Sequence, residues 1–75
     1  MKAKEFKAIL WNDFVCYGNS LSEIKRKLSK EANKRFDTYD YARVYTYRSD
    51  YKIYFELNRI NKKYPNNTIK RGKWL

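Results

Sequence analysis

A single segment of this chain has the period of an α-helix, and the segments on both sides of it alternate like β-strands. The helical segment follows Gly18 and opens with a capping box, in which Ser20 and Glu23 satisfy orphan backbone N–H groups. Apolar residues then recur in steps of three and four, which indicates one stripe of an amphipathic helix. We expect a helix over residues 21–35 that ends before Asp37. The stripe consists of Leu21, Ile24, Leu28, Ala32 and Phe36.

The segment after the helix predicts a hairpin with one clear register. Residues 41–58 contain two alternating stretches that meet at Ser49-Asp50, which favours a turn. One face of this pairing is mainly apolar, and the other pairs aromatic with aromatic and basic with acidic side chains. We expect Phe55 to lie opposite Leu28 of the helix. The predicted pairs are Ala42–Leu57, Val44–Phe55, Thr46–Ile53 and Arg48–Tyr51 on the first face, and Arg43–Glu56, Tyr45–Tyr54 and Tyr47–Lys52 on the second.

The segment before the helix predicts another hairpin, over residues 4–17, with less definite faces. Asn12-Asp13 tolerates the positive φ of a tight turn, and a two-residue loop there would place Trp11 opposite Phe14. Both faces are largely apolar, so the pattern does not identify the core face, and a single long strand remains an alternative. One face holds Phe6, Ala8, Leu10, Val15 and Tyr17, and the other holds Lys7, Ile9, Trp11, Phe14 and Cys16.

These elements predict an α+β fold: a small antiparallel sheet in the order ββαββ with one amphipathic helix packed on one face. A chain of 75 residues allows one domain with a thin core. We assign residues 1–60 to that domain and residues 61–75 to a basic C-terminal tail, in which residues 64–67 form a turn. The apolar residues that could anchor the tail are Ile69, Trp74 and Leu75.

The charge of the chain favours a polyanionic partner. The formal net charge is +10, from 18 basic and 8 acidic residues, which suits nucleic acid (DNA or RNA) or an acidic host protein. An AT-rich genome is the alternative explanation, because its codons enrich Lys, Asn, Ile and Tyr without selection for binding. The charge is uneven, since residues 59–75 hold six basic residues and no acidic one, whereas residues 37–58 are nearly neutral.

Two groups of cations are the candidate phosphate ligands. Lysine and arginine that neutralise phosphates release counterions, which supplies affinity for any sequence. A basic helix face is also typical of a face that is simply solvated. The helix cations therefore support phosphate binding only together with the acid-free tail. The candidates are Arg26, Lys27, Lys30 and Lys34 on the helix, and Lys62, Lys63, Lys70, Arg71 and Lys73 in the tail.

The outer face of the second hairpin supplies a third group of candidates. Interleaved aromatic and basic side chains on an open sheet suit the stacking of nucleobases. The β-propensity of tyrosine and a sheet-to-sheet homodimer account for the same pattern equally well. This face begins at Tyr41, and the candidates on it are Arg43, Tyr45, Tyr47, Lys52 and Tyr54.

The residues of catalytic and metal sites are scarce in this chain. It has no histidine, no glycine-rich phosphate loop and one cysteine, Cys16, so we expect neither an enzyme nor a metal or other cofactor. Asp37 and Asp40 are expected to cap the turn after the helix. A single cysteine suits a reducing, cytoplasmic location. Charged residues interrupt the start, so we expect no signal peptide and no membrane partner; they are Lys2, Lys4, Glu5 and Lys7.

Two stretches, residues 19–25 (NSLSEIK) and 61–69 (NKKYPNNTI), resemble small uncharacterised proteins of phages and mobile elements of low-GC bacteria. This resemblance brings no known active residues with it. It implies a second class of function, the binding and inhibition of a host protein such as a CRISPR effector or another nucleic-acid-processing factor. A basic inhibitor cannot mimic DNA, so it would occlude a site, compete for nucleic acid or block assembly. We expect non-catalytic nucleic-acid binding first, and inhibition of a host protein as the alternative.

Overall fold

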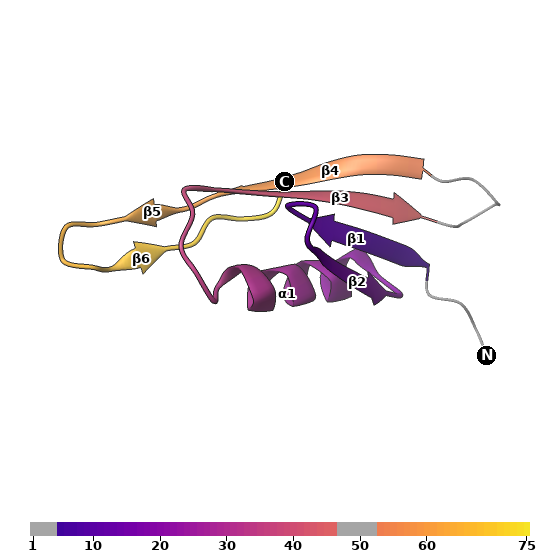
Figure 1. Cartoon of the computed structure of the whole chain (residues 1–75), viewed down its shortest axis with the longest axis horizontal. Coiled ribbons are helices and arrows are strands. Elements are labelled where there is room, and N and C mark those ends of the chain that lie inside the picture. Colours follow the sequence, from indigo (N-terminus) through magenta and orange to yellow (C-terminus); the bar gives the residue numbers. More distant parts are fainter. Residues whose placement is uncertain (1–4, 47–52) are drawn as a thin grey trace.

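The computed structural model describes residues 5–46 and 53–75, which form an α+β fold (Figure 1). Four antiparallel strands make the main sheet in the spatial order β2-β1-β3-β4, and one helix lies along one face of it. A separate two-stranded ribbon follows β4, so the ββαββ order is extended by two strands that the sequence did not predict. The elements are β1 (Phe6–Leu10), β2 (Phe14–Gly18), α1 (Leu21–Ala32), β3 (Tyr39–Thr46), β4 (Ile53–Ile60), β5 (Lys62–Lys63) and β6 (Ile69–Lys70).

Helix α1 begins where its capping box predicts. Ser20 Oγ accepts a hydrogen bond from Glu23 N at 3.1 Å, which satisfies one of the free N–H groups of the first turn. Glu23 Oε1 reaches back to accept from Asn19 N at 2.9 Å, one residue before the cap. The buried face of the helix consists of Ile24, Leu28 and Ala32.

The other end of α1 is shorter than predicted. The helix ends at Ala32, because the N–H groups of Lys34 and Arg35 donate only three residues back, to Glu31 O and Ala32 O at 3.2 Å. Such bonds tighten the last turn and stop the helix before residue 35. Phe36 therefore leaves the apolar stripe and lies in the connection to β3.

The β1–β2 hairpin has a different register from the predicted one. Leu10 pairs with Phe14, so the loop has three residues and Trp11 does not lie opposite Phe14. Positive φ falls on Trp11 (52°) and Asn12 (75°) and not on Asp13. A one-residue slip turns every β2 side chain to the other face, so burial of the apolar set outweighs the local preference of Asn-Asp for the turn. The helix-facing residues of this hairpin are Phe6, Ala8, Leu10, Phe14 and Cys16.

The β3–β4 hairpin has the predicted register. Val44 pairs with Phe55 and Tyr45 with Tyr54, and the other predicted pairs between residues 42 and 57 are also present. The strands continue two residues further, to the pair of Tyr39 with Ile60. The turn at residues 49–50 and the predicted pairs Arg48–Tyr51 and Tyr47–Lys52 lie outside the described residues.

The core lies between α1 and the facing side of the sheet. Its largest apolar side chains are fully buried, and Phe55 packs against the cluster that contains Leu28. Trp74, from the end of the chain, is only 6% exposed and belongs to the same cluster. The fully buried apolar residues of largest volume are Leu10, Ile24, Leu28 and Val44.

The other two apolar residues near the C-terminus leave their side chains in solvent. Ile69 is 39% exposed and Leu75 is 84% exposed. Leu75 is held instead by its backbone, which exchanges two hydrogen bonds of 2.9 Å with Asn58 and so covers part of the outer edge of β4. The chain end is thus docked by one aromatic side chain and one backbone pair.

Candidate nucleic-acid interface

The helix presents its free cations on the side opposite the core. Arg26 and Lys30 are exposed at positions that alternate with the buried face of α1. Within the described part of the chain, neither makes an ion pair with a carboxylate. These two residues therefore remain candidates for contacts with phosphate.

The other two helix candidates are already engaged. Lys27 Nζ lies 3.0 Å from Glu23 Oε2 and donates a 2.5 Å hydrogen bond to Tyr17 O on the edge strand β2. Lys34 Nζ lies 3.0 Å from Glu31 Oε1. Lys27 binds the backbone of the edge strand β2 and neutralises Glu23, so it is a poorer candidate for phosphate contact than the sequence suggested.

Residues 62–73, here called the basic arm, form a ribbon that projects beyond the sheet along the long axis of the molecule (Figure 1). Lys62 pairs with Lys70 and Lys63 with Ile69 across β5 and β6. The turn between them is closed by bonds from Tyr64 N to Thr68 O (2.8 Å) and from Asn67 N to Tyr64 O (2.9 Å). The whole molecule measures 48 × 21 × 20 Å. The arm concentrates cations on a narrow extension.

The base of the basic arm is joined to the end of α1. Arg71 Nη2 donates to Arg35 O at 3.1 Å. Lys63 Nζ and Arg71 Cζ lie 6.0 and 5.8 Å from the centre of the Phe36 ring, within range of a cation–π attraction. The structure thereby brings Lys63 and Arg71 to the same end of the molecule as Lys34 and Arg35. The sequence did not predict this junction.

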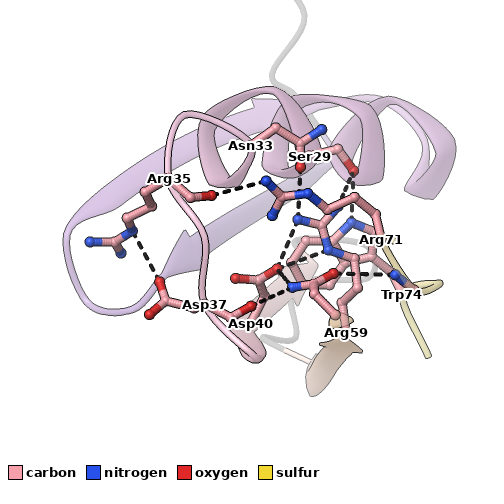
Figure 2. A network of polar contacts seen from close by, with 10 residues as sticks. Ser29, Asn33, Arg35, Asp37, Asp40, Arg59, Arg71 and Trp74 are labelled. Carbon is pink, nitrogen blue, oxygen red and sulfur yellow. Dashed lines mark hydrogen bonds and ion pairs between the residues drawn. The ribbon is translucent and has the colours of Figure 1, made fainter. Parts of the chain in front are cut away.

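A buried polar network fixes this junction (Figure 2). Arg59 pairs with Asp40 Oδ2 through Nη2 at 2.8 Å and through Nε at 2.9 Å, and the two side chains are 3% and 0% exposed. Arg59 Nη2 also donates to Asn33 Oδ1 (3.0 Å), and its Nη1 donates to Ser29 Oγ (3.3 Å). Arg59 is one of the six basic residues of 59–75, but its buried position removes it from any phosphate interface.

The same network holds both ends of the basic arm. Asn61 Nδ2 donates to Asp40 Oδ2 at 2.6 Å, and Asn61 Oδ1 accepts from Gly72 N at 3.2 Å. Trp74 Nε1 donates to Ser29 Oγ at 2.9 Å. A Cβ on Gly72 would lie 2.1 Å from Ile60 O, so only glycine permits this approach of the returning strand. The arm is therefore clamped immediately before β5 and immediately after β6.

Asp37 and Asp40, which were predicted to cap the turn after the helix, form ion pairs with arginines instead. Asp40 is a buried partner of Arg59 and not a cap of the turn. Asp37 Oδ2 pairs with Arg35 Nε at 3.3 Å, and its carbonyl accepts from Asn61 Nδ2 at 2.8 Å. The pair of Asp40 with Arg59 follows from the predicted register of β3 and β4 when it is extended two residues beyond Ala42 and Leu57, and it was missed because the hairpin was expected to end at residues 41 and 58.

The sheet face opposite α1 carries rows of tyrosines and aliphatic residues. Tyr45 and Tyr54 pack ring to ring, with centroids 5.3 Å apart and planes at 47°. Among the described residues, Lys7 and Arg43 are the cations of this face, and Arg43 donates a hydrogen bond to Asn12 Oδ1. The register places in one row Tyr17, Lys7, Tyr45 and Tyr54, and in the next row Val15, Ile9, Arg43 and Glu56.

Glu56 organises the tyrosine hydroxyls of this open face. Tyr41 and Tyr54 both donate to Glu56 Oε2, at 2.5 and 2.9 Å. These hydrogen bonds lower the pKa of Glu56 and raise the pKa of Tyr41. The predicted candidates Arg43, Tyr45 and Tyr54 lie on this face, where the tyrosine rings surround a carboxylate. Tyr47 and Lys52 fall outside the residues that the structure describes.

A small cleft that the sequence did not reveal lies between the β1–β2 turn and the end of α1. Its volume is about 140 Å³. The Arg35 guanidinium lies 3.6 Å from the centre of the Trp11 ring. The only hint in the sequence is an aromatic residue directly before the Asn-Asp turn. The cleft is lined by Trp11, Asp13, Phe14, Glu31, Lys34 and Arg35.

Among residues 5–46 and 53–75, no group of three or more His, Cys, Asp or Glu side chains is placed to hold a metal ion. Cys16 is buried, and desolvation raises the pKa of its thiol, which leaves it in the unreactive protonated form. None of the described helices is long and apolar enough to span a membrane.

Comparison with known proteins identifies no relative. No protein-family model matches the chain, and neither a curated protein nor a solved structure is significantly similar to it.

Proposed function

We propose that the protein binds nucleic acid without catalysing a reaction, and that the basic arm and the outer face of α1 make the contact. The observation that carries this proposal is the concentration of cations without carboxylate partners on a projecting ribbon. In the described part of the chain, the lysines of the arm make no ion pair with an acid. They are Lys62, Lys63, Lys70 and Lys73.

The acidic residues near the junction with α1 do not offset this charge. Asp40 pairs with Arg59, Asp37 with Arg35 and Glu31 with Lys34, so each is balanced by a cation outside the arm. The field around the arm therefore stays positive in a chain of net charge +10. Phosphates that replace its counterions would bind with an affinity largely independent of sequence.

The shape of the arm supports the same proposal. A two-stranded β-ribbon is one of the elements that the major groove of DNA admits. The clamp at Asn61 and Gly72 holds the ribbon in a fixed direction, which limits the ordering entropy that binding costs. The open tyrosine face is less suited to phosphate, because Glu56 lies among its rings.

The salt dependence of paired variants tests this proposal. The double variant Lys62→Ala, Lys70→Ala should flatten the slope of log K against log salt by about 1.8 on duplex DNA, at about 0.9 per lost contact. The matched control is Lys7→Ala with Lys27→Ala, which removes the same charge from the open face and the edge of β2. Equal effects of the two double variants would contradict an interface on the arm.

A second function is favoured by the open face of the sheet. Its tyrosines, with hydroxyls fixed by Glu56, supply rigid amphipathic contact area of the kind found in protein interfaces. The protein would then bind and inhibit a host factor, in the manner implied by the resemblance to phage and mobile-element proteins. A stoichiometric complex captured from a nuclease-treated bacterial lysate, and lost in Tyr45→Glu, would favour this function. Either activity suits the cytoplasm, where the Cys16 thiol stays reduced.

A further inference from the structure

The cleft beside Trp11 has the size of a subsite for one ring system. Its volume of about 140 Å³ lies well below the roughly 300–1,000 Å³ of pockets that enclose a whole drug-sized ligand. The cleft suits the planar end of a larger ligand whose remainder lies outside it.

The turn holds Trp11 at this cleft in an unfavourable backbone conformation. Trp11 has a φ of 52°, in the left-handed region that bulky side chains rarely adopt. Two hydrogen bonds maintain it, from Trp11 N to Tyr41 O (3.1 Å) and from Asp13 N to Leu10 O (3.0 Å). Strain of this kind persists where the surroundings impose it, and it clusters at ligand sites.

The facing groups suit a planar base. The Arg35 guanidinium lies 3.6 Å from the centre of the Trp11 ring and covers that face of the indole, so no base fits between them; the flat guanidinium, held by the indole, is the surface on which an unstacked base can stack. The carboxylate of Asp13 makes no hydrogen bond or ion pair with any other residue that the structure describes. It can therefore accept from an exocyclic amino group, as carboxylates do from cytosine N4.

Arg35 connects the cleft to the base of the basic arm. Arg35 contacts Trp11 through its side chain and accepts a hydrogen bond from Arg71 Nη2 through its backbone carbonyl. Lys34, on the wall of the cleft, is at the same end of α1. Through Arg35 the cleft lies at the end of α1 to which the base of the arm is joined.

We propose that this cleft binds one unstacked base of a single-stranded nucleic acid, and that it prefers a base with an exocyclic amino group. The inference rests on the proposed function and adds to it a subsite that distinguishes single strands from duplexes. Phosphate contacts on the arm serve both kinds of nucleic acid, whereas only an unpaired base can enter the cleft.

Labelled oligo(dC), oligo(dT) and a duplex of equal length test this inference by fluorescence anisotropy. Trp11→Ala, which removes the ring that holds the Arg35 guanidinium, should weaken binding of oligo(dC) roughly 5- to 150-fold, the range for loss of one base stack, and leave the duplex unchanged. Asp13→Ala should remove a preference for oligo(dC) over oligo(dT) of about 2- to 12-fold, the worth of one net hydrogen bond. Tyr17→Ala, an exposed aromatic on the open face, is the matched control and should change neither affinity.

Trp11 also packs partly against the core, so thermal melts must accompany these measurements. Arg35→Lys avoids that difficulty, because it keeps the charge and removes only the flat guanidinium. It should weaken oligo(dC) and spare the duplex. If Trp11→Ala and Arg35→Lys both bind oligo(dC) as the parent does, the cleft is not a base subsite, although binding through the arm would stand. If the parent binds neither single strands nor duplexes, the proposed function fails and the subsite fails with it.

Discussion

The buried pair of Asp40 and Arg59 should be the most sensitive polar contact in the protein. Asp40→Asn keeps the shape of the side chain and removes its charge, which leaves the Arg59 guanidinium buried without a counter-charge. The same substitution at Asp37 provides a matched control. Asp37 also pairs with an arginine, Arg35, but the two side chains are 46% and 53% exposed.

The expected magnitudes of the two changes differ severalfold. Breaking a buried ion pair by removing one partner costs about 3–5 kcal/mol, whereas an exposed pair contributes about 0.2–1 kcal/mol. At about 0.05–0.15 kcal/mol per residue, a 75-residue domain has roughly 4–11 kcal/mol of unfolding free energy. Asp40→Asn should therefore remove a large fraction of the stability, and Asp37→Asn should remove little.

Urea unfolding followed by circular dichroism and by tryptophan fluorescence measures both effects. Asp40→Asn should shift the midpoint far below that of the parent, and the Trp74 signal should change with it, because Arg59 lies 4.8 Å from that ring. Equal costs for Asp40→Asn and Asp37→Asn, both below about 1 kcal/mol, would refute the idea that this pair holds the C-terminal segment in place.

Three further substitutions test other parts of the structure. Leu28→Ala, at a fully buried position, should cost about 2–5 kcal/mol of unfolding free energy, and a melting temperature equal to that of the parent would contradict the packing of α1 on the sheet. Gly72→Ala should cost about 1–3 kcal/mol by forcing Ile60 O away, whereas Gly18→Ala, whose nearest contacts are the flexible side chain of Glu23 at 3.2 Å, should cost less in the same urea experiment. Because hydrogen bonds lower the pKa of Glu56 in the folded protein, its contribution to stability is present at neutral pH and is lost as the pH falls through that pKa. The stability difference between the parent and Glu56→Gln should therefore shrink from pH 7 to pH 3, and a difference independent of pH would contradict this role.

The elements that local patterns determine were predictable, and those that depend on distant neighbours were not. The start of α1 follows from Ser20 and Glu23, which are close in sequence. The β3–β4 register follows from side-chain pairs that agree on both faces at once. In the first hairpin both faces are apolar, so only packing against α1 decides the register. Positive φ was predicted at Asn12 and Asp13, and the structure has it at Trp11 and Asn12.

The candidate site was predictable in the same partial way. A segment rich in lysine and free of acids can be read from the sequence, and the structure places Lys62, Lys63 and Lys70 on one ribbon. The clamp that fixes the direction of this ribbon joins residues 11 to 45 positions apart, from Asn61 with Gly72 to Ser29 with Trp74. No local pattern predicts such contacts, because they form only when the strands and the helix are already in place.

The dependence of nucleic-acid affinity on salt, measured for the parent protein, tests whether the basic arm binds phosphates. Each phosphate contact contributes a slope of about −0.9 on duplex DNA and about −0.7 on a single strand. The four lysines of the basic arm alone should give a slope of log K against log salt of about −3.6 on the duplex and about −2.8 on the single strand, and contacts from Arg26 and Lys30 of α1 should make it steeper. A slope near zero on both, or no binding at low salt, would contradict the account of this protein as a nucleic-acid-binding protein that works through its basic arm.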